Sequence, residues 1–207
     1  MHYLRQILFV AALSSCLSAN GNAKTPDVEQ LRDLLQPISS LSAQFDQQII
    51  DSNGIETQRA KGLFQLAQPY TLRWVVSEPM PQQVISDGQT LWLYDEDLEQ
   101  VIVQSVDSSI NSTPVMLFSG DLQQLNRTYS VLQISKGLFE LTPKQNKSLF
   151  ALIRLDFSNK VPKSLVMVDN LGQTTTINLT SVVVNPEISA DQFIFKIPDG
   201  IDVIHND

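Results

Sequence analysis

The pattern that decides the fold is clearest in Val84-Ile85-Ser86-Asp87-Gly88-Gln89-Thr90-Leu91-Trp92-Leu93-Tyr94-Asp95. Two short apolar runs stand on either side of the pair Asp87-Gly88. An Asp-Gly pair favours a tight hairpin turn, and short runs of branched and aromatic residues are typical of strands. The stretch therefore predicts a β-hairpin, and Asp95-Glu96-Asp97 predicts a second turn at its far end.

The same alternation of short runs and turns extends in both directions from this hairpin. Further strands are expected over residues 41–50, 59–66, 70–76, 98–106, 129–134, 138–143, 149–157, 162–169 and 174–184. About ten or eleven short strands joined by turns predict a mainly β fold with an antiparallel sheet curled into a sandwich or barrel. A parallel α/β sheet is disfavoured because no long helices alternate with the strands.

Four short segments are predicted to be helical. Thr25-Pro26-Asp27 has the pattern of an N-cap, a proline at the first helical position and an acidic first turn. Apolar residues then recur at helical spacing until Pro37 limits the helix. Residues 112–118 begin with a second cap signal, and residues 121–125 predict one more turn. Residues 189–192 predict a single helical turn.

Composition excludes several classes of protein. The chain of 207 residues has 14 Lys+Arg against 22 Asp+Glu, a formal charge of −8, so binding to nucleic acid or to anionic lipid surfaces is not expected. Cys16 is the only cysteine, and the histidines are His2 and His205, which excludes a disulfide and a Cys/His zinc site. No nucleotide-binding motif or G-x-S-x-G elbow is present. We therefore expect no enzyme, metal or cofactor.

The first residues have the pattern of a targeting segment. A short positive start is followed by an apolar run, Ile7 to Leu17, and by the small residues of Gly21-Asn22-Ala23. This predicts a signal peptide over residues 1–23, cleaved before Lys24, and one domain over residues 24–207 outside the cytoplasm. An alternative remains open, because Leu13-Ser14-Ser15-Cys16 resembles a lipobox at which Cys16 would be lipidated.

The segment Val115-Met116-Leu117-Phe118 is apolar on every side for one turn. A barrel of this size fills its lumen with side chains or holds a ligand. The segment therefore predicts either a plug that completes the core or a lid over an apolar cavity, and the pattern does not separate the two.

Several motifs in one register resemble the LolA family of periplasmic outer-membrane lipoprotein carriers. They are Lys61-Gly62-Leu63-Phe64, Pro69, Leu72-Arg73-Trp74, the hairpin of residues 84–95, Leu98-Glu99-Gln100-Val101, Thr113-Pro114 with Leu117, Leu141-Thr142-Pro143-Lys144, and Phe193-Ile194-Phe195 with Pro198-Asp199-Gly200. The similarity covers nearly all of residues 27–203.

The resemblance implies an open, unclosed antiparallel β-barrel with short helices as a lid over a cavity for acyl chains. It also implies a monomeric periplasmic carrier, loaded with acylated lipoproteins by an inner-membrane ABC transporter of the LolCDE type. The carrier then delivers them to a LolB-type outer-membrane receptor, with no stable membrane insertion of its own.

The resemblance, together with strand alternation, assigns residues to the cavity. The strand candidates are Phe64, Leu72, Trp74, Val76 and Val84, and the lid candidates are Leu31, Leu35, Val115 and Phe118. By parity Arg73 is expected on the opposite face of the sheet. A role as ordinary core remains the alternative for each candidate.

One position departs from the family. The family usually has an Arg before the proline at Pro69, where it holds the lid closed by hydrogen bonds to the lid backbone, and this chain has Gln68. Glutamine lacks the charge and the five donors of arginine. We expect weaker lid closure, or a latch supplied by another residue.

Three functions other than the carrier remain as alternatives. A LolB-like lipidated receptor would use Cys16, and a periplasmic sensor of the RseB type would carry a second domain for which this chain is too short. An enzyme would use carboxylates such as Asp87, Asp95, Glu96 and Asp97, which are better explained as turn and hairpin-tip residues.

Overall fold

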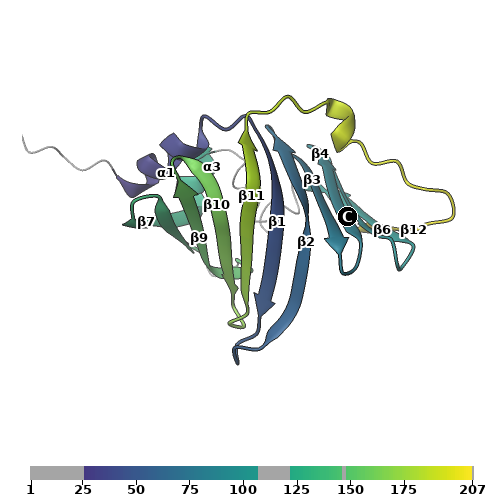
Figure 1. The fold of residues 1–207 in the computed structure, drawn as a ribbon, viewed down its shortest axis with the longest axis horizontal. Coiled ribbons are helices and arrows are strands. Elements are labelled where there is room, and N and C mark those ends of the chain that lie inside the picture. Colours follow the sequence, from purple (N-terminus) through teal and green to yellow (C-terminus); the bar gives the residue numbers. More distant parts are fainter. Residues whose placement is uncertain (1–25, 107–121, 146–147, 207) are drawn as a thin grey trace, which may run out of the picture.

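A computed structural model describes residues 26–106, 122–145 and 148–206. The strands in these ranges form one sheet of twelve, in the order β12-β6-β5-β4-β3-β2-β1-β11-β10-β9-β8-β7 (Figure 1). Their bounds are β1 Ser40–Ile50, β2 Glu56–Ala67, β3 Thr71–Glu78, β4 Gln82–Asp87, β5 Thr90–Asp95, β6 Gln100–Ser105, β7 Tyr129–Ser135, β8 Leu138–Pro143, β9 Phe150–Ser158, β10 Val161–Asp169, β11 Thr174–Val184 and β12 Asp202–Asn206.

The sheet is strongly curved and does not close on itself, because β12 and β7 are its two edges (Figure 1). This confirms the mainly β fold and the open antiparallel barrel. The eleven expected strands are all present with small shifts at their ends. The twelfth, β12, was not predicted, and it pairs with β6 in parallel. All five of its residues are exposed, so its sequence has no buried face that would mark it as a strand.

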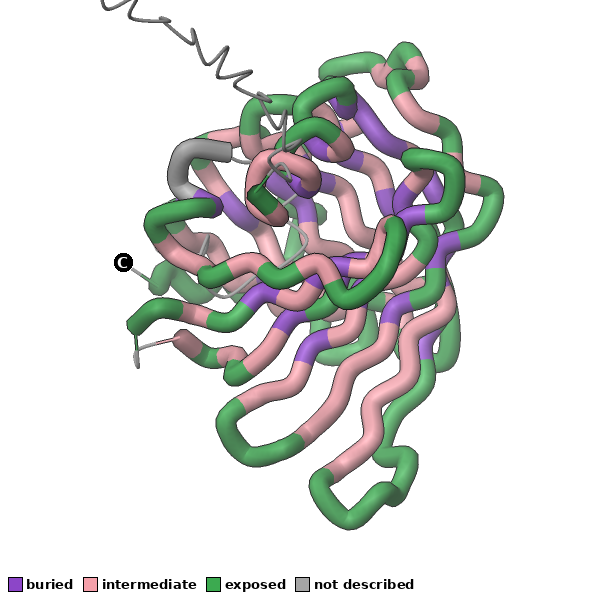
Figure 2. Tube along the Cα trace, turned by 90° about the vertical axis from the view of Figure 1, so that its left-hand side faces the viewer, coloured by how far each residue is buried: buried purple, intermediate pink, exposed green. Residues whose placement is uncertain are grey.

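The hydrophobic core lies on the concave side of the sheet. Alternate residues of β1, Leu41, Ala43 and Phe45, are at most 3% exposed and belong to one apolar cluster with residues of the neighbouring strands. Buried residues gather in the upper part of the tube view, whereas the hairpin ends at its bottom are exposed (Figure 2). Burial therefore changes along the strands as well as between the two faces.

Two helices and one 3₁₀ turn accompany the sheet in the described ranges, namely α1 Asp27–Leu35, α3 Leu122–Thr128 and η3 Ala190–Phe193. The short first helix before Pro37 is confirmed. Its start differs from the prediction, since Pro26 has an extended ψ of 142° and occupies the N-cap position ahead of the helix. The predicted segment 115–118 lies outside the described residues.

The outer, convex face of the sheet is covered in part by the segment between β11 and β12. Phe193 of η3 is 4% exposed, and the Phe195 ring lies 5.4 Å from the Tyr94 ring and 6.3 Å from the Trp92 ring. Arg73 Nη1 donates to the carbonyl oxygen of Gln192 at 3.4 Å. Arg73 therefore lies on the outer face, as its parity predicted.

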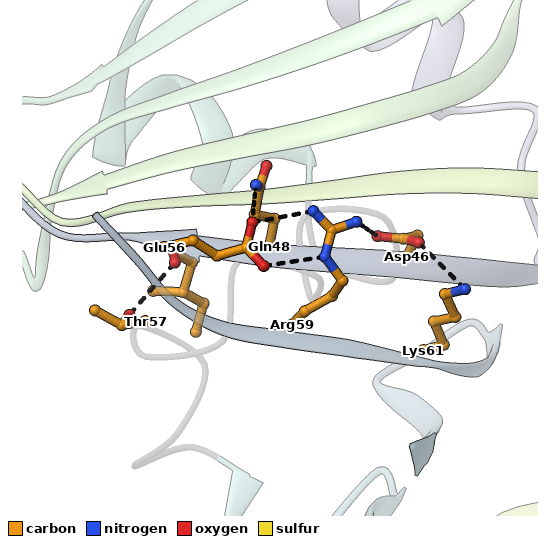
Figure 3. A network of polar contacts seen from close by, with 7 residues as sticks. Asp46, Gln48, Glu56, Thr57, Arg59 and Lys61 are labelled. Atoms are coloured by element: carbon orange, nitrogen blue, oxygen red, sulfur yellow. Dashed lines mark hydrogen bonds and ion pairs between the residues drawn. The ribbon is translucent and has the colours of Figure 1, made fainter. Parts of the chain in front are cut away.

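A second feature of the outer face is a polar network between β1 and β2 (Figure 3). Arg59 Nη2 lies 3.0 Å from Glu56 Oε2, Arg59 Nη1 lies 3.7 Å from Asp46 Oδ1, and Gln48 also donates to Glu56. Hydrogen bonds from Arg59 and Gln48 lower the pKa of Glu56 from 4.5 to about 2. Because this carboxylate is exposed, salt screens the interaction.

The lowered pKa of Glu56 predicts a pH-dependent contribution to stability. The contribution is fully present above pH 4.5 and is lost as the pH falls toward 2, because the folded state then binds the proton that the unfolded state has already taken up. Glu56→Gln should lower the melting temperature at pH 7 and low salt, and its difference from the wild type should vanish near pH 2. Glu99→Gln, at an exposed carboxylate with no ion pair to a described residue, is the control. A difference that is the same at both pH values would contradict the prediction.

Candidate functional site

The candidate site is the concave face beneath α1. This helix packs on the sheet through Leu31 and Leu35, which are 0% and 1% exposed, and Ile38 just after the helix is 1% exposed. Arg32 and Asp33 lie on its exposed side. The helical spacing of the apolar residues thus places one stripe of the helix on the sheet and the charged stripe in water.

An aromatic cluster forms the floor of the site. The rings of Phe45 and Trp74 are stacked with centroids 3.8 Å apart, and Phe64 lies 5.7 Å from Trp74. Gly62 makes this possible, because a Cβ there would lie 1.8 Å from the carbonyl oxygen of Val75 and 2.8 Å from the Phe45 ring. Phe45 was not among the predicted site residues, although its alternation with Leu41 and Ala43 was a signal that could have found it.

Apolar surface becomes accessible toward one end of this face. Along β3, Leu72 is 1% exposed, whereas Trp74 and Val76 are only partly buried. Along β5, Leu91 is buried and Leu93 is partly buried. The accessible end carries the β3–β4 and β5–β6 turns. The β2–β3 turn, which contacts the segment after α1 through Gln68, lies at the opposite end of the sheet.

The predicted lining residues therefore fall into three groups. Leu31, Leu35, Phe64 and Leu72 are fully covered by protein in this structure. Trp74, Val76 and Val84 lie on the concave face, pack against the core cluster and keep accessible apolar surface. Val115 and Phe118 lie outside the described residues.

Gln68 reaches the segment that follows α1. Its Nε2 donates to the carbonyl oxygen of Ile38 at 2.7 Å, and its main-chain N–H donates to that of Ser39 at 2.9 Å. The side chain thus makes a hydrogen bond to the backbone at the end of the predicted lid, with one donor in place of the several that arginine has.

A second residue, Asn185, holds the same segment and was missed by the sequence analysis. Its Oδ1 accepts hydrogen bonds from the main-chain N–H groups of Ser39 and Ser40 at 2.8 and 3.3 Å, and its Nδ2 donates to the carbonyl oxygen of Pro37 at 2.8 Å. Asn185 has a φ of 58°, a left-handed conformation that asparagine tolerates better than most residues. At the other end of α1, Asp27 Oδ2 accepts from the main-chain N–H of Gln133 on β7 at 2.9 Å.

Another hollow is less suited to apolar ligands. A groove of about 770 Å³ lies where α1 meets the β7–β8 and β9–β10 turns, and its lining includes Gln30, Asp33, Lys136 and Lys160. Charged groups would lose hydration against an acyl chain, so the apolar concave face is the better site.

Within the described ranges, no group of three or more His, Cys, Asp or Glu residues is placed to hold a metal ion. No helix in the same ranges is long and apolar enough to cross a bilayer.

Comparison with known proteins identifies the family. The model of the family described as outer membrane lipoprotein carrier protein LolA matches residues 36–196. The chain belongs to the LolA family.

Two curated relatives of this LolA-family chain are named outer-membrane lipoprotein carrier protein. The one from Chromohalobacter salexigens is 41% identical over 192 residues, which is 91% of each chain. The one from Azotobacter vinelandii is 36% identical over 204 residues, 97% of this chain and 98% of the relative. A solved structure of an uncharacterized conserved protein from Thermus thermophilus has the same fold, with a TM-score of 0.51 at 11% identity, over 86% of this chain and 99% of that one.

The hydrogen bonds of Asn185 predict a measurable loss of stability. Asn185→Gly keeps the left-handed backbone but leaves the polar groups of residues 37–40 without these partners, and it should cost about 1–2 kcal/mol. Asn185→Asp, which keeps the acceptor oxygens, should lose less. The measurement is the midpoint of urea unfolding.

Asn159→Gly is the matched control. Asn159 also has a positive φ, 50°, but its side chain forms no hydrogen bond to a described residue. An equal loss of stability in the two glycine variants would show that the backbone change alone, and not the side chain of Asn185, is responsible.

Proposed function

We propose that this protein carries acylated lipoproteins through the periplasm and binds their acyl chains on the concave apolar face. Residues 1–23 would act as a cleaved signal peptide, a transporter of the LolCDE type would load the carrier, and a receptor of the LolB type would accept the cargo. Membership of the LolA family supports the proposal. The structural observation that carries it is the accessible apolar surface of Trp74, Val76 and Val84 beside a helix-covered core.

The energetics of the cargo explain why a carrier of this kind needs no catalytic group. Three acyl chains of about 15 methylenes each cost on the order of 35 kcal/mol to expose to water, at roughly 0.8 kcal/mol per methylene. Non-covalent affinities reach a limit near about 20 kcal/mol. Extraction from a bilayer must therefore be driven by another protein, and the chains must pass between apolar sites without meeting water.

In this proposal α1 is a movable cover. It contacts the sheet through the apolar stripe of Leu31 and Leu35, and polar contacts from Asp27, Gln68 and Asn185 hold its two ends. Displacing the helix would expose Leu31 and Leu35, and with them the part of the apolar cluster that they cover, to a ligand. The same residues would then be core in the empty protein and lining in the loaded one.

The experiment that tests the proposal uses the protein from Lys24 onward, purified without detergent. It is added to proteoliposomes that contain a LolCDE-type transporter, ATP and a labelled lipoprotein, and the soluble fraction is analysed. Soluble one-to-one complexes that pass their cargo to a LolB-type receptor are expected. If the folded protein releases no lipoprotein, the carrier function is wrong. The tethered receptor would then be tested by analysing the native N-terminus for a lipidated Cys16.

A charge on the concave face should prevent binding of the acyl chains. Val84 pairs with Trp74 across β3 and β4, and it is only partly buried, so Val84→Glu should fold. Burying the new carboxylate against an acyl chain is costly, and we expect at least a tenfold loss of affinity for a fluorescent fatty acid at pH 7. Val183→Glu, on the outer face at 52% exposure, is the matched control and should bind normally. Equal affinities for the two variants would exclude Val84 from the site.

The hydrogen bond of Gln68 predicts how firmly the cover is held. Gln68→Arg offers more donors to the segment after α1 and should slow the release of bound lipoprotein to the receptor severalfold, whereas Gln68→Ala should speed it. Stopped-flow transfer of a fluorescent lipoprotein measures the rate. Gln89→Ala, at an exposed glutamine of the β4–β5 turn, is the control. Unchanged release in both Gln68 variants would remove this residue from the mechanism.

A further inference from the structure

Five turns at one end of the sheet each expose a large apolar side chain. The turns are β1–β2, β3–β4, β5–β6, β8–β9 and β10–β11, which we call the apolar rim. Their apolar residues are Ile55 at 62% exposure, Met80 at 51%, Leu98 at 69%, Leu149 at 57% and Leu171 at 85%. The described turns at the other end, residues 68–70, 88–89, 136–137 and 159–160, contain no exposed large apolar residue.

Contacts between the turns gather these side chains into two groups. A Cβ on Gly172 would lie 3.2 Å from Ser52 Cβ, and Asn170 Nδ2 donates to the carbonyl oxygen of Ser148 at 2.7 Å. The β1–β2, β10–β11 and β8–β9 turns are therefore neighbours, as the first two are at the bottom of Figure 1. The main-chain N–H of Glu96 donates to the carbonyl oxygen of Pro81 at 3.4 Å, which joins the β5–β6 turn to the β3–β4 turn.

Three of the apolar residues are held in place by the same device. An aspartate at the start of the turn accepts a hydrogen bond from the main-chain N–H of the apolar residue itself. The pairs are Asp51 with Ile55 at 2.9 Å, Asp95 with Leu98 at 3.0 Å and Asp169 with Leu171 at 2.8 Å. A turn that is already ordered loses little conformational entropy when its side chain enters a pocket. The exposed apolar side chains of the rim are therefore already in ordered positions before a partner binds.

The charge of the rim indicates the kind of partner. Its turns and their flanks carry the carboxylates of Asp51, Glu78, Asp95, Glu96, Asp97, Glu99 and Asp169. Against these, the described residues of the five turns hold one ammonium group, that of Lys144, and Lys147 lies outside the described residues. On the flank of the β1–β2 turn, Arg59 and Lys61 form ion pairs with Glu56 and Asp46. The opposite end exposes Lys136 and Lys160. An anionic bilayer would repel the acidic rim, whereas a protein surface rich in Lys and Arg would attract it.

The rim also borders the accessible end of the concave face, where Trp74 and Val76 are only partly buried. Exposed apolar side chains that cluster on one side of a protein mark an interaction site. We propose that the apolar rim docks on a folded protein partner whose surface combines apolar hollows with Lys and Arg side chains. The inference rests on the proposed function, in which the partner is a membrane-bound protein that loads or receives cargo.

The test compares two triple variants of the full mature chain. Ile55→Ser, Leu98→Ser and Leu171→Ser remove the held apolar side chains, and the main-chain hydrogen bonds to the aspartates remain available. Leu132→Ser, Ile134→Ser and Val183→Ser form the matched control, because these residues are 54%, 50% and 52% exposed but lie outside the rim. Binding is measured to LolCDE-type proteoliposomes, to a soluble LolB-type receptor, and to protein-free vesicles of phosphatidylethanolamine and phosphatidylglycerol. A fluorescent fatty acid reports the acyl site.

The rim variant should bind at least one of the two protein probes tenfold or more weakly than the wild type does. The control variant should bind both proteins as tightly as the wild type, and both variants should bind the fatty acid normally. Raising the salt from about 50 to about 500 mM should weaken wild-type binding, and Asp97→Lys should reduce that salt dependence. Equal binding of both variants to both proteins would overturn the inference, as would a loss specific to protein-free vesicles. A wild type that binds no fatty acid and takes up no lipoprotein would instead overturn the proposed function, and this inference with it.

Discussion

The apolar concave face of an open sheet is the constraint on which the rest of this structure depends. Edge strands β7 and β12 do not meet, so the sheet cannot enclose its own apolar side chains as a closed barrel does. Apolar surface in water is costly, at roughly 25 cal/mol per Å². Something else must cover this face, either another part of the chain or an apolar ligand.

The covering by α1 follows from this constraint. Leu31 and Leu35 of the helix and Ile38 just after it supply the apolar contact, and the hydrogen bonds that orient the helix lie at its two ends. A cover of this kind can be displaced without breaking the hydrogen bonds between the strands, because none of the sheet ladder passes through it. An acyl chain offers the concave face the same apolar contact as the helix, and this is the physical basis of the proposed exchange between an empty and a loaded form.

The sequence predicts most of this architecture because local rules decide it. The turn at Asp87-Gly88 and the alternation of Leu72, Trp74 and Val76 each depend on a few adjacent residues, and the structure has them as expected. Asn185 could not be found in this way, since its hydrogen bonds reach residues about 146 positions earlier in the chain. Strand β12 could not be found in this way either, because its backbone pairing with β6, and not its sequence pattern, marks it as a strand. The stacking of Phe45 on Trp74 depends on Gly62, which lies on the strand between them.

The exposure of Trp74, Val76 and Val84 beside a tightly packed core ties the fold to the proposed function. The most direct measurement of that link is photocrosslinking with a lipoprotein whose acyl chains carry a diazirine, followed by mass spectrometry of the cross-linked peptides. We expect cross-links to the concave residues of β3, β4 and β5, including Trp74 and Val84. Cross-links confined to the outer face, for example around Trp92 and Phe195, would contradict it.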